Sequence, residues 1–298
     1  MNLKKDFKKA VILSFFSIIC LGVFNQAQAI DMPRIDKSKI RLWLKPGQAE
    51  SGEIILENIT DEAMSIRAYP QDWFYSSGDG SKEFVPSGAT SRSCASWVSF
   101  SPTDFILAAF SRQKVRYNVK VPAEAGSGGY YSVLFFENMI GKVPELDFKQ
   151  AVGLNLTVRF ATLFYIEVGG GAIERKGELE NFQMKKAGLY APLLISGVFK
   201  NTGNVDVIAS GVFAIMDKVG RVRGRGKISD LYALPGDNAK LKGIWRESLP
   251  AGNYTFVLTL DLGQAGHKSV FEKGPFLIKE IELEIAEDGS LSGIEELK

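Results

Sequence analysis

Residues 113–138 read QKVRYNVKVPAEAGSGGYYSVLFFEN, and this stretch decides the fold. In residues 114–121 apolar and polar residues alternate, so that Val115 and Tyr117 share one face, as in a half-buried strand. Residues 130–136 are apolar on both faces, which is typical of a strand at the centre of a sheet. A turn carrying Pro and Gly joins the two. The stretch therefore predicts two neighbouring strands of a β-protein.

A similar sequence pattern occurs at residues 249–258, which read LPAGNYTFVL. In both copies a turn with Pro and Gly delivers a tyrosine, Tyr130 or Tyr254, to the start of a buried strand. This resembles the tyrosine corner of immunoglobulin-like sandwiches, in which the phenol hydrogen-bonds back to the preceding turn. Two copies predict an all-β chain with two immunoglobulin-like β-sandwich domains in tandem.

Short apolar runs separated by turns every 8 to 12 residues support this fold class. Further strands are expected at residues 40–44, 52–58, 64–69, 97–100, 105–107, 151–168, 192–200, 205–216 and 278–285. A run of three glycines after residue 168 suggests a linker. We expect a signal peptide at 1–29, an N-terminal domain at 30–168, a Gly-rich linker at 169–177, a C-terminal domain at 178–286 and a flexible acidic tail at 287–298.

The first 29 residues have the three parts of a secretory signal peptide. Lysines precede an apolar run at residues 10–24, and Ala27 and Ala29 are the small residues of a cleavage site. A membrane anchor is the alternative, but the run is shorter than the roughly 20 residues that span a bilayer. Cys20 would suggest a lipoprotein, although Ile19 precedes it where a small residue is required. We expect export across the inner membrane to the periplasm or cell surface, with no membrane span in the mature chain.

Cleavage would remove four of the 36 basic residues and one of the 34 acidic residues, which leaves 32 and 33. The mature chain would be nearly neutral, so charge gives no indication of a nucleic-acid partner. Cys94 would be the sole cysteine, so no internal disulfide is expected. His267 is the only histidine, and together with one cysteine it cannot supply a zinc site of the usual type. A Ser-His-Asp arrangement would have to use His267 as its base, in what reads as a surface loop. We expect a non-enzymatic protein without cofactor or metal.

Several features together resemble the N-terminal domain of periplasmic pilus chaperones. They are the signal peptide, Lys45-Pro-Gly47 before an apolar strand, Asn58 at its end, residues 97–107, the strand from Lys114, and residues 129–136. The second half is more similar to generic bacterial surface immunoglobulin-like domains. The resemblance implies a partner that is another envelope or pilin-like protein, and no catalysis.

The longest predicted strand, residues 151–168, is the sharpest functional candidate. Its end, Leu163-Phe-Tyr165, is similar to the end of the strand that pilus chaperones lend to their clients. Such a strand at a sheet edge completes a partner's fold through main-chain hydrogen bonds and alternate side chains. The candidate partner-binding side chains are Leu154, Leu156, Val158 and Phe160. The alternative is that they line the domain's own core.

The resemblance also implies a basic pair in the cleft that holds the client's C-terminal carboxylate. Arg159 lies near one expected position, and Arg41 or Lys39 near the other, although none matches the family residue for residue. Residues 221–227 form the only dense basic run, which suits either a solvated hairpin or contact with an anionic glycan or lipid. Glu280, which alternates with two further glutamates, fits a solvated strand face better than a carboxylate-only hydrolase.

These observations predict a periplasmic chaperone-like or adaptor protein that binds a partner by β-strand complementation. The alternative is a structural or adhesion protein of the cell envelope, whose immunoglobulin-like domains bind a surface protein or cell-wall glycan.

Overall fold

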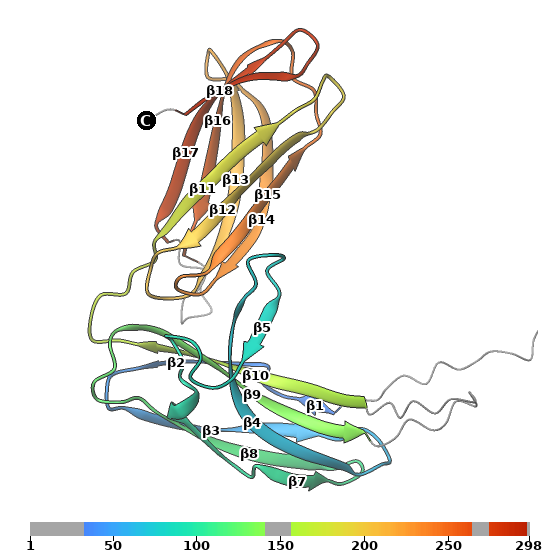
Figure 1. The fold of residues 1–298 in the computed structure, drawn as a ribbon, viewed down its shortest axis with the longest axis vertical. Coiled ribbons are helices and arrows are strands. Elements are labelled where there is room, and N and C mark those ends of the chain that lie inside the picture. The colour runs from blue at the N-terminus through green and yellow to red at the C-terminus, as the bar shows by residue number, and fades with distance from the viewer. Residues whose placement is uncertain (1–32, 141–155, 264–273, 297–298) are drawn as a thin grey trace, which may run out of the picture. The chain divides into compact units, whose positions relative to one another are not determined.

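The computed structural model describes residues 33–140, 156–263 and 274–296 (Figure 1). Apart from one 3-10 turn, Ala95–Trp97, its regular elements are β-strands, which confirms the all-β class. The strands of the first half are β1 (Arg34–Ile35), β2 (Lys39–Leu44), β3 (Ala49–Glu57), β4 (Met64–Tyr75), β5 (Lys82–Val85), β6 (Val98–Ser101), β7 (Asp104–Leu107), β8 (Arg112–Lys120), β9 (Gly128–Ile140) and β10 (Leu156–Val168). Those of the second half are β11 (Gly177–Lys185), β12 (Leu193–Asn201), β13 (Val207–Asp217), β14 (Val222–Ala233), β15 (Asn238–Trp245), β16 (Gly252–Asp261), β17 (Phe276–Ile285) and β18 (Leu291–Glu296).

The first half is a sandwich of two sheets with one core between them. One sheet has the order β1-β3-β8-β6, and the other has the order β2-β10-β9-β4-β5, with β7 also paired to β4. The inward side chains of β8, including Val115 and Val119, are fully buried, as their alternation predicts. Strand β9 lies between β10 and β4, and it is apolar on both faces because Leu134 and Phe136 belong to the first core while Tyr131, Val133 and Phe135 belong to a second buried cluster.

The second half encloses its core with one continuous sheet in the order β11-β12-β15-β14-β13-β16-β17-β18. Strands β14 and β15 are joined through a single residue pair, Ile228 and Gly243, so the sheet folds over at this point. A side chain at Gly243 would meet Ile228 at 2.5 Å, so glycine permits the close approach. Residues from β11 to β17 then share one buried cluster, and the second half is also a sandwich.

Both predicted tyrosine corners are present. The Tyr254 hydroxyl donates to the carbonyl oxygen of Pro250 at 2.8 Å, and the Tyr130 hydroxyl donates to that of Gly126 at 3.2 Å. In each case the acceptor lies four residues earlier in the chain. The corner therefore ties each buried strand to the turn that precedes it.

A buried asparagine repeats the same turn in both sandwiches. Asn58 Oδ1 accepts from the N–H of Thr60, and its Nδ2 donates to the carbonyl of Glu62. Asn201 makes the same bonds, from the N–H of Gly203 and to the carbonyl of Val205. Because a buried polar group must be hydrogen-bonded, each asparagine fixes the turn that follows its strand.

One expectation was wrong. Residues 291–296, expected in a flexible tail, form β18, which pairs antiparallel with β17. Leu291 supplies an apolar contact to the second core, and its N–H donates to the carbonyl of Lys186, so the segment is held by packing as well as pairing. The domain boundary at 169–177 stays a prediction. The proposed signal peptide lies outside the described residues, and none of the described residues forms a helix of the length and apolarity that a bilayer crossing requires.

Candidate functional site

Strand β10 has one edge that is open along half its length. It pairs with β9 from residue 156 to residue 168, but its parallel pairing with β2 covers only residues 163–168. The hydrogen bond from the N–H of Leu163 to the carbonyl of Ser38 marks where that second pairing begins. Among the described residues, 156–162 therefore have a strand on one side only. Since backbone groups alternate along a strand, the N–H groups of Thr157, Arg159 and Ala161 point to the open side.

The two faces of this open segment differ. Phe160 points to the first core, where its ring stacks on Phe136 with centroids 5.6 Å apart, and it is half-buried. Val158 is also half-buried, whereas Thr157 and Arg159 are exposed. Phe160 thus contributes to the domain's own core, as the alternative interpretation held, while the backbone beside it is open. Leu156 begins β10, and Leu154 lies outside the described residues.

The outer face of the same sheet is strongly aromatic. Trp73, Tyr131 and Tyr165 form edge-to-face pairs with centroid distances from 5.4 to 6.2 Å. Leu234 of the second half belongs to the same buried cluster, so this aromatic face extends across both sandwiches. The sequence showed these aromatic residues only as members of apolar strands, and their convergence depends on the pairing of β4, β9 and β10.

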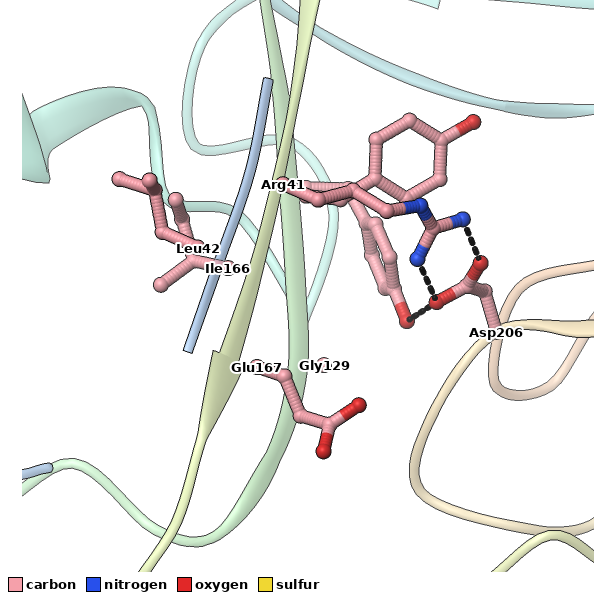
Figure 2. Close-up of a pocket in the computed structure, with 8 residues that line it drawn as sticks. Arg41, Leu42, Gly129, Ile166, Glu167 and Asp206 are labelled. Carbon is pink, nitrogen blue, oxygen red and sulfur yellow. Dashed lines mark hydrogen bonds and ion pairs between the residues drawn. The ribbon is translucent and has the colours of Figure 1, made fainter. Parts of the chain in front are cut away.

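An ion pair joins β2 to the loop before β13 next to this aromatic face (Figure 2). Arg41 Nη1 donates to Asp206 Oδ1 at 3.2 Å, and Nη2 donates to Oδ2 at 2.5 Å. The Tyr131 hydroxyl donates to Oδ1 at 3.4 Å. The guanidinium also lies 4.1 Å from the centre of the Tyr165 ring. Asp206 is thus bound in the bidentate geometry that arginine gives to carboxylates.

Burial and neighbouring charges shift the pKa values of Arg41 and Lys39. Burial by itself lowers the pKa of Arg41, but the Asp206 carboxylate outweighs that effect and the pKa is raised. Lys39 Nζ lies 4.9 Å from the centre of the Tyr165 ring. Burial and the neighbouring Arg41 charge lower the pKa of Lys39, and the attraction of Asp206 only partly compensates. An additional carboxylate beside Lys39 would therefore relieve an unfavourable charge environment.

The structure brings Lys39 and Arg41 together but leaves Arg159 apart from them. Lys39 is opposite Leu163 in the register, four residues beyond Arg159, which corresponds to about 13 Å along the strand. The Arg159 guanidinium instead lies 5.2 Å from the centre of the Phe135 ring, and its Nη1 donates to the Tyr69 hydroxyl at 3.5 Å. The three residues do not form one carboxylate site in this structure.

Sequence reasoning missed Asp206, whose side chain is only 9% exposed. Nothing near position 206 in the sequence indicates that its partner lies 165 residues away.

The remaining candidate residues from the sequence lie apart from this cluster. Residues 221–227 lie at a hairpin turn and on β14, with Arg223 bound to Asp217 at 2.9 Å, and Glu280 is exposed on β17. His267 lies outside the described residues, within which no group of metal ligands occurs.

No family model matches the chain, and no curated protein matches it. Its structure is similar to a chain of the chaperone-tip adhesin complex of CFA/I fimbriae biogenesis, with 14% identity, 84% of this chain and 98% of that chain covered, and a TM-score of 0.45. The class 5 fimbriae chaperone CfaA is 13% identical, with 83% of this chain and 98% of that chain covered and a TM-score of 0.42. A chain of the Salmonella enterica SafA pilin in complex with the SafB chaperone is 11% identical, with 85% of this chain and 97% of that chain covered and a TM-score of 0.38. The solved structures to which this chain is similar thus include fimbrial chaperones and their complexes, and no comparison supports a cell-wall glycan partner.

Proposed function

We propose that this protein is a non-enzymatic, periplasmic chaperone-like protein that holds an incomplete, pilin-like β-protein by strand pairing. The observation that carries the proposal is the open edge of β10 at residues 156–162. An exposed strand edge readily pairs with another chain, and natural proteins usually protect it with charge, a bulge or a covering segment. Among the described residues, 156–162 form a regular strand with apolar residues on its core-facing side and no strand paired to its second edge.

The partner segment would add one strand beside β10. Its backbone would hydrogen-bond to Thr157, Arg159 and Ala161, whose N–H groups point to the open side. The half-buried side chains of Val158 and Phe160 lie at the margin of the first core, where they would also contact the core of an incomplete partner. Leu154 and Leu156, which alternate with them in the sequence, are further candidates for this contact.

The open edge ends beside a cation, which supports a carboxylate anchor at that point. Lys39 is opposite Leu163, where the pairing with β2 begins, so a strand that fills residues 156–162 would end next to Lys39. Arg41 already binds Asp206 through both Nη atoms. Lys39 is therefore the better candidate for a carboxylate at the partner's C-terminus, and Arg41 would position it through the shared Tyr165 ring.

The experiment that tests this proposal is co-production with a pilin-like subunit that lacks one strand, followed by purification of the complex. Thr157→Pro removes an N–H that points to the open side and leaves the bonds to β9 in place. We expect this variant to fold with a wild-type unfolding transition and to lose most of the stoichiometric capture. Unchanged capture by Thr157→Pro would show that β10 does not pair with the partner.

Two further variants separate capture from folding. Replacing Leu156 and Val158 with Ser should weaken capture while cooperative unfolding persists; loss of cooperative unfolding would instead assign both side chains to the core. Ile106→Ser is the matched control, because Ile106 is 73% exposed on β7 at the opposite edge of the same sheet. It should leave both capture and stability unchanged.

A further inference from the structure

The outward face of β14, β13, β16 and β17 carries its charges at its two margins. Arg225 on β14 is opposite Ala214 on β13, which is opposite Val257 on β16, which is opposite Glu280 on β17. These four residues form one row across the sheet, and Arg225 and Glu280 are exposed at its two ends. Since strands lie about 4.8 Å apart, the two charges are separated by roughly 14 Å.

Each neighbouring row carries a charge at one end only. The row on one side runs from Lys227 through Val212 and Thr259 to Ile278, and the row on the other side ends at Glu282. Val212 is 52% exposed and Ile278 is 59% exposed. Over these three rows the face has cations on β14, acids on β17 and an uncharged strip two strands wide between them. We call it the β13–β16 face.

The marginal charges have no ion-pair partner within the described part of the chain. No carboxylate oxygen lies within 4.0 Å of Arg225 or Lys227, and no basic nitrogen lies within that distance of Glu280 or Glu282. Arg223 differs, because Asp217 binds it at 2.9 Å. Charges of both signs thus remain available to an external partner whose own charges are arranged in the opposite order.

We propose that the β13–β16 face binds the same face of a second copy of this chain. A two-fold axis parallel to the strands, between β13 and β16, brings each β14 opposite the β17 of the second copy. It also keeps each row opposite the equivalent row of the second copy. Arg225 then meets Glu280 of the second copy at both margins, and Ala214 meets Val257. A two-fold axis perpendicular to the strands would place cations opposite cations, so charge selects the first arrangement.

Such an interface would be isologous, as in most homodimers. Four rows across four strands, the fourth with Ser210 opposite Asp261, cover roughly 400 Å² on each copy, since alternate residues repeat about every 6.8 Å along a strand. That area is smaller than the about 800 Å² per partner of a typical stable interface. We therefore expect a weak dimer with a dissociation constant in the micromolar range, weakened further by salt because the marginal charges are exposed.

Sedimentation of the purified protein from about 1 µM to about 1 mM, the range of weak association, tests the proposal. The wild type should be a dimer at high concentration. Arg225→Glu alone and Glu280→Arg alone should each be monomeric, because like charges then meet at both margins. An equimolar mixture of the two variants should dimerise, because opposite charges again meet at both margins. Unfolded variants could not restore each other, so this mixture separates a lost interface from a lost fold.

Lys242→Glu is the matched control, because Lys242 points outward from β15, away from the β13–β16 face. It should leave the sedimentation of the wild type unchanged. A wild type that stays monomeric over the whole range would overturn the proposal, as would a mixture of Arg225→Glu and Glu280→Arg that fails to dimerise. The proposal uses neither β10 nor Arg41, so its outcome is independent of partner capture.

Discussion

Arg41 and Asp206 are 165 residues apart in the chain, and both Nη atoms of Arg41 contact the two carboxylate oxygens of Asp206, at 3.2 and 2.5 Å. Arg41 belongs to β2 of the first sandwich, and Asp206 precedes β13 of the second. The pair therefore links the two sandwiches through a charge-assisted, bidentate contact beside the aromatic face. Both side chains are mostly buried, at 24% and 9% exposure, so water cannot replace either partner easily.

Replacing Arg41 with Ala should lower the free energy of unfolding by about 2–4 kcal/mol, because it leaves the buried Asp206 carboxylate without its cation. Urea denaturation measures the loss. Removing Asp206 as well, in Arg41→Ala with Asp206→Ala, should recover part of the stability, since no charge is then left unpaired. Arg112→Ala is the control: its ion pair with Glu57 is 69% exposed on the arginine side, and the change should cost less than about 1 kcal/mol.

Lys39 should make the capture of a partner carboxylate dependent on pH. Burial and the Arg41 charge hold the pKa of Lys39 below its ordinary 10.5, and a bound carboxylate would raise it again. Affinity is then full below the pKa of free Lys39 and falls as the pH rises through the pKa of free and then of bound Lys39.

Titration of the pilin-like subunit's C-terminal peptide from about pH 7 to about pH 10 measures this fall, which should begin at lower pH than for an ordinary lysine. Lys39→Met should bind more weakly at pH 7 and lose the alkaline decline. An alkaline decline that persists in Lys39→Met would assign the titration to another group.

The tyrosine corners should differ in their contribution to stability. Tyr254→Phe removes a 2.8 Å hydrogen bond at a buried position and should cost about 1 kcal/mol. Tyr130→Phe removes a longer bond of 3.2 Å that is exposed to water, and it should cost less. Thermal unfolding of both variants measures which substitution lowers the stability more. A larger loss of stability for Tyr130→Phe would show that bond length and burial do not govern the contribution of these two corners.

The sequence predicted those parts of the fold in which a local pattern determines the structure. The alternation of residues 114–121 reappears as β8, and both predicted tyrosine corners form, because each depends on a turn and a strand that are adjacent in the sequence. Strand β14 was not predicted, because its charged residues and glycines obscure the alternation of apolar and polar residues. β18 was missed because an acidic composition at the chain end suggested disorder.

The candidate site could be predicted only in part, because it depends on pairing between distant strands. The long apolar strand could be recognised as a candidate, but its open edge follows from where β2 begins to pair, at Lys39 and Leu163. No local pattern encodes that point. The same holds for Arg41, which was predicted as an anchor for a client's carboxylate and whose partner in this structure, Asp206, comes from the other sandwich.

Cys94 should be chemically inert while the protein is folded. Its side chain is fully buried, and burial raises the pKa of the thiol to about 12, although the hydroxyl of Ser132 at 3.2 Å favours the thiolate slightly. Because the thiolate is the reactive form, a thiol reagent at about pH 8 should react only through unfolding. In the chain without residues 1–29, the reaction rate should rise with urea in parallel with the unfolded fraction. Ser96→Cys, which introduces a thiol at an exposed neighbouring position, should react at once in the native state and shows that the reagent is competent. Fast native-state labelling of the parent protein would mean that the first core opens locally around Cys94.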